Sequence, residues 1–386
     1  MEILSAFECK YPSDCIYFSR KNRDYFGVGL YFLEDELTQN RIGGISIYNK
    51  NKIINEFSKK FKTKLTYEAS KPDLFINTES GVVNFEWDKF DDDFYTNNVN
   101  NHNCSSHNSD LITCLCSNKT IKYYYVDLES LNYTLLNSIR SKNVDDNNNI
   151  IGLDLSSVSH NGTKKTCYSI SDGRVFIIKD MEFIDTEFIA HNKTEVWTVS
   201  FLDNTQGNIL ATGGDDCAIS LWDLRTSNSI YDGVVKNLNA HSMGVTCIEK
   251  YDHSQNHLFW SGSYDETLSL WDIRNFSTPI EKVNVCGGVW RISNLNYANN
   301  HFVGLALCYF GFKYYNINSK NDFYYFKEAI SLPNESENVD SIRHKSIVYG
   351  LDSLYNHNCQ GPNSVLSATC SFYDNTVIIS SVLLSD

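Results

Sequence analysis

The sequence of 386 residues predicts an all-β fold, a seven-bladed β-propeller whose four-stranded sheets are stacked around a central channel. The prediction rests on two copies of one unit within residues 212–280: a Gly-rich turn, an Asp, an alternating strand and Trp-Asp. The Asp residues, Asp216 and Asp265, are 49 positions apart, and Trp222 and Trp271 each follow by six residues. Repeats of this length indicate propeller blades, because one such sheet cannot bury both of its faces alone.

Each full repeat also carries a histidine upstream of its Asp, at His191 and His241. We expect each histidine to hydrogen-bond to the Asp of its own blade, with a Thr or Ser hydroxyl and the Trp indole N–H completing a buried polar network. Such networks rigidify a fold, so a structural role is favoured over a catalytic one for the His, Asp and Trp residues of both repeats. Asp374 aligns with these Asp residues in the last blade, where Ser380 stands at the Trp position.

The first three blades lack the Trp-Asp mark and are identified from alternating or apolar segments separated by turns. The first, about residues 11–80, contains CIYFSR, YFGVGLYFLE and RIGGISIYNK, and residues 50–80 are expected to hold its outer strand and an irregular connection. The second covers about residues 81–140 and includes LITCLCS and TIKYYYVD; the third, about residues 150–189, includes TCYSIS and DGRVFIIKD.

The full repeats are blades four and five, at about residues 190–238 and 239–285. Blade six, about residues 286–330, is degenerate, and blade seven covers about residues 342–386, so residues 1–386 form one domain. The last blade lacks an outer strand, and residues 2–8 are expected to supply it and close the ring. Asn-rich stretches at residues 91–110 and 143–149 have almost no apolar content and are expected to be solvated insertions.

Composition limits the function classes. The formal net charge of −14 argues against nucleic acid as a partner, because phosphate binding needs basic patches. No run approaches 18 apolar residues and the amino terminus does not resemble a signal peptide, so we expect no membrane span and a cytoplasmic protein. The 12 cysteines are scattered without a CxxC pair, which favours reduced, packed thiols, and no metal or cofactor is expected.

A candidate site follows from blade geometry, since hydrolase signatures such as GxSxG and HExxH are absent from the sequence. In each blade, the residue before the structural Asp and a residue near the start of the innermost strand should project to the channel rim. These positions hold Asp215, Tyr264, Tyr373, Trp197, Thr246, Trp290 with Arg291, and Tyr349. Aromatic faces attract quaternary ammonium groups, although these side chains could also simply pack the mouth.

Several motifs resemble one family. In order, GGDDCAISLWDLR, HSMGV, SGSYDETLSLWDIRN, GGVWRI, GFKYYNI, HKSIVYG and SATCSFYD, which span about Trp197 to Asp374, resemble the WD-repeat diphthine methylesterase family, also called diphthamide biosynthesis protein 7. The resemblance implies a hydrolase that removes the methyl ester from methylated diphthine, a modified histidine on translation elongation factor 2. That substrate carries a trimethylammonium group beside the ester, which an aromatic site at Trp197, Tyr264, Trp290, Tyr349 and Tyr373 would suit.

Ester cleavage requires oxyanion donors and a base. Arg291 or the backbone N–H groups of Gly287 and Gly288 are candidate donors, and His344 is the first candidate for the base. The alternative is that His344 is the structural histidine of blade seven, paired with Asp374. Asp215 could orient a histidine, activate water or neutralise the ammonium group. Cys370 and Ser371 are the nearest nucleophile types, and neither has a recognisable activating partner.

Two other functions are compatible with the sequence. The segments WDLR and WDIR, which end at Arg225 and Arg274, resemble the paired boxes of substrate receptors for cullin-type ubiquitin ligases. In that reading the protein is an adaptor without catalysis, whereas the alternative for both arginines is a local salt link within the blade. The third possibility is a reader that binds methyl-lysine or another trimethylammonium group without hydrolysis.

Overall fold

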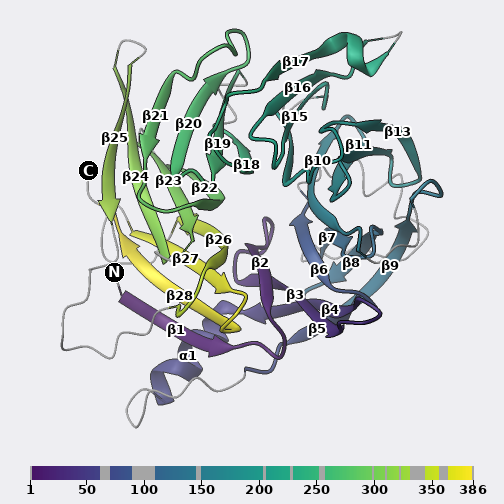
Figure 1. The fold of residues 1–386 in the computed structure, drawn as a ribbon. Coiled ribbons are helices and arrows are strands. Elements are labelled where there is room, and N and C mark those ends of the chain that lie inside the picture. Colours follow the sequence, from purple (N-terminus) through teal and green to yellow (C-terminus); the bar gives the residue numbers. More distant parts are fainter. Residues whose placement is uncertain are drawn as a thin grey trace.

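The structure, a computed structural model, describes residues 2–60, 70–88, 109–144, 149–202, 206–226, 229–251, 257–297, 300–308, 311–320, 323–330, 344–355 and 364–384. Seven four-stranded antiparallel sheets are arranged around a common centre (Figure 1). This arrangement confirms the seven-bladed β-propeller predicted from the sequence. Most of the two Asn-rich stretches, residues 91–108 and 145–148, lies outside the described residues.

The sheets follow one another along the chain, and each falls within one of the ranges expected for a blade. The first two sheets contain β2 (Ser13–Phe18), β3 (Tyr25–Asp35), β4 (Asn40–Asn49) and β5 (Leu74–Asn77), then β6 (Val82–Trp87), β7 (Ser109–Cys116), β8 (Ile121–Asp127) and β9 (Asn132–Ile139). The next two contain β10 (Gly152–His160), β11 (Thr163–Ile170), β12 (Arg174–Lys179) and β13 (Phe183–Ile189), then β14 (Thr198–Phe201), β15 (Ile209–Gly213), β16 (Ile219–Asp223) and β17 (Val234–Asn237).

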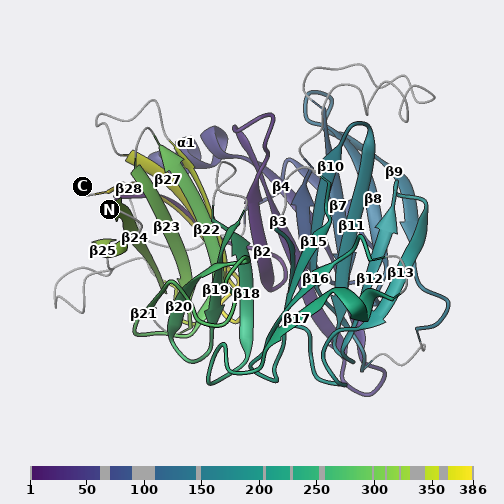
Figure 2. The ribbon, with the colours of Figure 1, turned by 90° about the horizontal axis from the view of Figure 1, so that it is seen from above.

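The last three sheets complete the ring. They contain β18 (Val245–Lys250), β19 (Leu258–Ser263), β20 (Thr267–Asp272) and β21 (Glu281–Asn284), then β22 (Val289–Tyr297), β23 (Asn300–Leu307), β24 (Gly311–Lys320) and β25 (Phe323–Ile330), and finally β26 (Val348–Tyr355), β27 (Ser364–Ser371), β28 (Thr376–Leu383) and β1 (Glu2–Glu8). Seen at right angles to the first view, the strands of neighbouring blades run side by side (Figure 2).

Burial along the strands follows from the stacking of the blades. Every residue of β7, β19 and β27 is buried, because the second strand of a blade packs against neighbouring blades on both faces. The outermost strands β9 and β13 instead mix exposed and buried residues. Outer strands therefore tolerate polar residues, whereas the second strands consist mainly of apolar and small residues.

The ring is closed by the N-terminal strand. β1 pairs antiparallel with β28, from Glu2 opposite Ser381 to Glu8 opposite Thr376, and Figure 1 shows the purple β1 beside the yellow β28. The pairing continues past β1, where the Cys9 N–H donates to the Asn375 carbonyl at 2.8 Å. The predicted closure is thus confirmed, with the first strand of the chain as the outermost strand of the last blade.

A helix stands where the sequence was expected to give only a strand and an irregular connection. α1 (Lys50–Lys60) begins after Asn49, whose side-chain oxygen accepts the N–H groups of Asn51 and Lys52 at 3.1 Å each. It lies outside the ring against β1 and β4 (Figure 1, Figure 2) and buries Ile53 there. The sequence did not predict this helix, because a polar residue such as Asn49 can end a strand as well as cap a helix.

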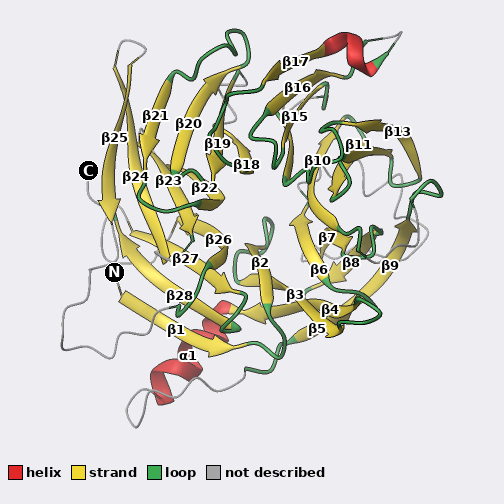
Figure 3. Cartoon of the chain, viewed as in Figure 1, coloured by secondary structure: helices red, strands yellow, loops and turns green. Residues whose placement is uncertain are grey.

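Helices make up little of the described chain, as Figure 3 shows. Besides α1, the short 3₁₀ helix η2 (Ile230–Gly233) precedes β17. Neither described helix has the length and apolar character that a bilayer-spanning helix needs.

The innermost strands are tied to one another by side chains that accept backbone N–H groups. Asp352 of β26 accepts the Phe18 N–H of β2 at 2.9 Å, and Asp154 of β10 accepts the Val199 N–H of β14 at 3.1 Å. An innermost strand has only one neighbour within its own sheet, so its free N–H groups need such partners when buried. These bonds cross from blade to blade and fix the strands around the centre.

Blades four and five contain the polar networks expected from the repeats. In blade four, His191 Nδ1 lies 2.8 Å from Asp216 Oδ1 and its Nε2 lies 2.9 Å from Thr212 Oγ1, which also accepts the Trp222 indole N–H at 3.0 Å. In blade five, His241, Asp265, Ser261 and Trp271 repeat this arrangement, with distances between 2.7 and 3.2 Å.

The charge on Asp265 is stabilised inside its network. Burial opposes this charge, but hydrogen bonds from His241 and Thr267 and from the Ser242 backbone outweigh it and lower the pKa of the carboxyl. A carboxyl with a lowered pKa stabilises the fold fully above the pKa that it has in the unfolded chain, about 3.9. This stabilisation is lost as the pH falls from there through the pKa of the folded state.

We therefore predict that Asp265→Asn lowers the free energy of unfolding near neutral pH by about 1.5–3 kcal/mol, as expected for a hydrogen bond to a charged group. The variant should also lose less stability than the wild type below about pH 4. Denaturant unfolding at neutral and acid pH measures both effects. Asp232→Asn, at an exposed position of η2, is the control. Equal acid sensitivity of Asp265→Asn and the wild type would contradict this account.

Candidate functional site

One backbone irregularity recurs at the start of the innermost strands. In six blades the ladder to the next strand skips the second residue of the innermost strand, which marks a β-bulge. In blade four, Trp197 stands directly before β14, whose ladder begins at Thr198. Bulges redirect side chains. We call these positions the bulge ring: Asp14, Val83, Leu153, Trp197, Thr246, Trp290 and Tyr349.

The structure brings together the five aromatic residues that the sequence singled out. Trp290 is at the centre, with ring centroids 6.0 Å from Trp197, 5.6 Å from Tyr264 and 4.9 Å from Tyr349. Tyr349 continues the contact to Tyr373 at 6.1 Å. Tyr373 is 67% exposed and the other four are partly buried, so this aromatic cluster is open to solvent. A role in binding remains a prediction for these residues.

Two further aromatic residues extend the cluster and were missed in the sequence. Phe372 lies 5.3 Å from Tyr349, and Tyr31 of β3 lies 5.7 Å from Phe372, both between ring centroids. The sequence analysis selected only the residue directly before each structural Asp. This rule selects Tyr373 and leaves out Phe372. Tyr31 stands on a second strand, where the sequence carries no signal for the channel mouth.

Asp215 borders the cluster on the side of Trp197. Its Oδ1 accepts the Trp197 indole N–H at 3.2 Å, and the residue is exposed. The carboxylate therefore stands at the solvent edge of a surface made of aromatic faces. Both kinds of group attract a cation, the rings through their negative faces and the carboxylate through its charge.

Arg291 directly follows Trp290, and its guanidinium carbon lies 6.0 Å from the centroid of the Trp290 ring. Burial opposes its charge, but interactions with Asp154, Tyr17 and Asp14 outweigh this effect and raise the pKa of the guanidinium. Two buried N–H donors at this place, Arg291 Nε and Trp290 Nε1, have no hydrogen-bond partner among the described residues. Unpaired buried donors are costly for a fold and are therefore often explained by a ligand or a function.

His344, the candidate base, lies in the structural network of blade seven. Its Nδ1 lies 2.7 Å from Thr376 Oγ1 and its Nε2 2.8 Å from Thr369 Oγ1, while Asp374 Oδ1 is 4.0 Å away. Both ring nitrogens are engaged and the side chain is 3% exposed, so it does not face the aromatic cluster. These contacts match the structural alternative for His344 and make it a weaker candidate for the base.

The neighbouring nucleophile types are sequestered. Cys370 is fully buried, and burial raises the pKa of its thiol well above the ordinary value. A thiol in that state is a poor nucleophile, because the thiolate is the reactive form. Ser371 is also fully buried. Water is consequently a better candidate than either side chain for attack on a carbonyl group at the mouth.

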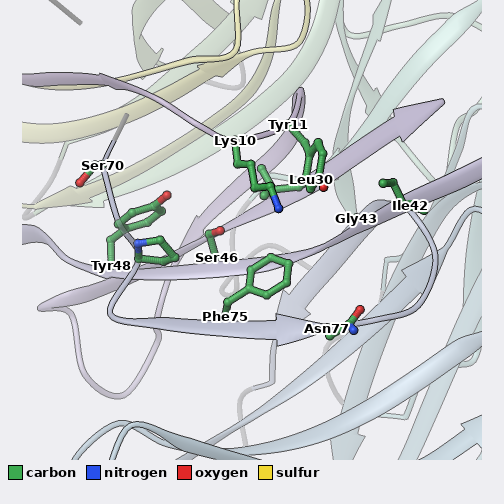
Figure 4. A pocket seen from close by; sticks show the side chains of 11 residues that line it. Lys10, Tyr11, Leu30, Ile42, Gly43, Ser46, Tyr48, Ser70, Phe75 and Asn77 are labelled. Atoms are coloured by element: carbon green, nitrogen blue, oxygen red, sulfur yellow. The ribbon is translucent and has the colours of Figure 1, made fainter. Parts of the chain in front are cut away.

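Blade one contains a separate cavity of about 340 Å³. Figure 4 shows Lys10 and Tyr11 above Ser46 and Phe75, with Tyr48 at one side. None of the site residues predicted from the sequence lines this cavity. Lys10 is the charged residue among the described side chains of the lining, and no carboxylate stands among them.

The arginines of the WDLR and WDIR segments are held within their own blades. Arg225 donates Nε to Asp223 Oδ1 at 2.8 Å and Nη2 to Oδ2 at 2.6 Å. Arg274 makes the same pair of bonds to Asp272, at 2.9 and 2.6 Å. This geometry is the local salt link that the sequence left as an alternative to a docking role.

Comparison with known proteins adds a family context. The model of the family "WD domain, G-beta repeat" matches residues 182–223 and 233–272. A curated relative from Schizosaccharomyces pombe, "Diphthine methyltransferase", is 25% identical over 375 residues, which cover 96% of this chain and 94% of the relative.

A chain of the "Crystal Structure of Mitotic Checkpoint Complex" superposes with a TM-score of 0.62 at 13% identity, over 98% of this chain and 94% of that chain, and it supports the fold alone. The WD repeats and the curated relative together confirm the resemblance of this chain to a WD-repeat, diphthine-modifying family.

Proposed function

We propose that this protein is a carboxylic-ester hydrolase that removes the methyl ester from methylated diphthine on translation elongation factor 2. The observation that carries the proposal is the open aromatic cluster with a carboxylate at its edge and unpaired N–H donors at Trp290 and Arg291. Methylated diphthine has the complementary groups, a permanent cation and an ester, close together. The named relative supports the choice of diphthine as the modified residue.

The aromatic cluster would hold the trimethylammonium group. Trp290 and Tyr349 offer ring faces, and Asp215 adds a negative charge at the solvent side. Each cation–π contact contributes about 0.5–2 kcal/mol, more where the cation is desolvated. Tyr373 is largely exposed, so the substrate could approach from that side while still attached to a large protein.

The unpaired donors of Trp290 and Arg291 would act on the ester. Water attacks the carbonyl carbon, and the tetrahedral intermediate carries a negative charge on the former carbonyl oxygen. Arg291 Nε and Trp290 Nε1 are the donors suited to stabilise that oxyanion, because they are buried and already in place. Collapse of the intermediate expels methanol and leaves the carboxylate of diphthine.

A second candidate is methyl transfer to diphthine, which the printed name of the Schizosaccharomyces pombe relative favours. This reaction forms the methyl ester and requires a methyl donor, for example a sulfonium compound. The cationic part of the substrate would be bound in the same way in both directions. The direction of the reaction therefore has to be measured.

We predict that the purified protein converts elongation factor 2 bearing methylated diphthine to the free acid. The intact mass of the factor should fall by the mass of one CH2 group, the difference between a methyl ester and its acid. Methanol should appear in an equal molar amount. Elongation factor 2 bearing unmethylated diphthine, incubated with a sulfonium methyl donor, is the matched reaction for the alternative. If the unmethylated factor gains the mass of a methyl group and the methylated factor loses none, the protein is a methyltransferase and the hydrolase proposal is wrong.

The same assay separates the binding functions. A complex with methylated elongation factor 2 and no change of mass would identify a trimethylammonium reader. Neither binding nor conversion would refute the proposal and leave the adaptor, in which Arg225 and Arg274 would have to leave their own Asp partners to dock a ubiquitin ligase.

A further prediction tests the cation site by itself. Trp290→Ala and Asp215→Asn should each weaken the binding of a trimethyl-lysine peptide by about 2- to 30-fold, the range equivalent to one cation–π or charge contact. Isothermal titration calorimetry measures the affinity, and thermal melting verifies that the variants fold. Phe183→Ala and Asp185→Asn, at exposed positions of the outer strand β13, are the matched controls. Unchanged affinity in both site variants would exclude this cation site.

A further inference from the structure

The bulge ring contains one carboxylate that the sequence did not single out. Asp14 is the bulge residue of β2, because Ser13 pairs with Leu30 and Cys15 pairs with Gly29. The corresponding residues of blades six and seven are Trp290 and Tyr349. Blade one lies next to blade seven in the ring, where β2 packs against β26. Asp14 therefore follows Tyr349 around the same ring of positions.

The backbone around Asp14 is fixed from two sides. The Ser13 hydroxyl donates to the Ser371 carbonyl of blade seven at 3.0 Å, and the Tyr31 N–H donates to the Pro12 carbonyl at 3.0 Å. Gly350 also allows a close approach, since a Cβ there would lie 2.9 Å from the backbone nitrogen of Ile16. Such support holds a side chain in position before a substrate arrives.

Titratable groups of several strands interact electrostatically with Asp14. Arg291 of β22 interacts with it favourably, and Tyr31, Tyr349 and the thiols of Cys15 and Cys370 also respond to its charge. Burial raises the pKa of Asp14 to about 7, and the charge of Arg291 opposes this rise. A carboxyl group with such a pKa exchanges its proton near neutral pH, where a general base is most effective.

Three other carboxylates are less suitable as the base. Asp154 already accepts two hydrogen bonds, from Asn84 Nδ2 at 2.7 Å and from the Val199 N–H at 3.1 Å, and thereby joins three strands. Glu86 stands three residues beyond the bulge of β6, away from the ring of Trp290 and Tyr349. Asp215 is exposed and bound to Trp197 at the outer edge of the cluster.

From this placement in the bulge ring, next to Tyr349 in the order of the blades, we infer that Asp14 is the general base of the ester hydrolysis. The inference rests on the proposed function and supplies a base in place of His344. Asp215 and Asp14 then have different tasks. The exposed Asp215 attracts the ammonium group, and Asp14 of the bulge ring accepts the proton.

The reaction balances without any further reagent. The Asp14 carboxylate accepts a proton from water while the water oxygen bonds to the ester carbonyl carbon. The carbonyl oxygen becomes the oxyanion, to which Arg291 and the Trp290 indole N–H donate. When the carbon–methoxy bond breaks, the proton on Asp14 passes to the leaving oxygen. Methanol departs, and the new carboxylic acid releases its proton to solvent.

We predict that Asp14→Asn lowers the turnover of elongation factor 2 bearing methylated diphthine by about 100- to 10,000-fold, the range of a lost general base. The affinity for the trimethyl-lysine peptide should not change. In the wild type, kcat/KM should rise with pH and level off above about 7, because only the ionised carboxylate accepts a proton. Asp14→Glu should restore part of the rate. Asp24→Asn, exposed in the turn at the other end of β2, is the control.

A second variant gives a result that a purely structural role of Asp14 would not produce. Arg291→Met removes the charge that lowers the pKa of Asp14, so the rise of kcat/KM should move to higher pH in addition to the lower rate. Because Asp14 is retained in this variant, the measurement tests its role as general base even if Asp14→Asn does not fold. A rise at the wild-type pH would overturn the assignment.

The outcomes for the two proposals are distinct. No turnover by the wild type would refute the hydrolase and the role of Asp14 with it. Wild-type turnover together with an undiminished Asp14→Asn variant would refute the role of Asp14 alone. A variant that loses peptide binding and turnover equally would mean that Asp14 serves the binding of the substrate and not the chemical step.

Discussion

The extra residue at the second position of the innermost strand, present in six of the seven blades, is the constraint on which the site depends. It offsets Trp290, Tyr349 and Asp14 from the ladders of their sheets in the same way, although each belongs to a different sheet. The bonds from Asp352 to β2 and from Asp154 to β14 hold these strands against one another. Because the bulges sit on packed strands and not on loops, the side chains they redirect have little freedom to move, as a preorganised site requires.

Polar groups in this protein fall into two kinds. The networks around His191, His241 and His344 are closed, since both nitrogens of each ring have partners. Such networks specify and rigidify blades. At the channel mouth, in contrast, Arg291 and Trp290 keep buried donors without partners among the residues described. This difference distinguishes the three histidine networks from the channel mouth.

The sequence predicted the ring and most of the aromatic cluster. The Trp-Asp motifs of blades four and five define the positions within a blade, and the same positions in blades six and seven hold Trp290, Tyr349 and Tyr373. The sequence could not predict Asp14, since blade one has no such motif and its bulge cannot be located without the pairing of β2 with β3. For His344 the spacing to Asp374 fitted two roles, and only the contacts with Thr369 and Thr376 distinguish them. The helix α1 was missed because its capping residue, Asn49, also ends a strand.

The pairing of β1 with β28 also bears on how the molecule is made. During translation β1 leaves the ribosome long before β28 does, so the nascent chain must keep its first strand unpaired while successive blades stack. An open arc of sheets presents exposed edges that invite aggregation, which makes the unfinished chain a natural client for chaperones. Asp14 follows β1 by a few residues, and its strand β2 packs against β26 of the last blade, so the channel mouth is complete only when that blade has been made. Any function that needs the whole mouth should therefore arise at once, with the final strand.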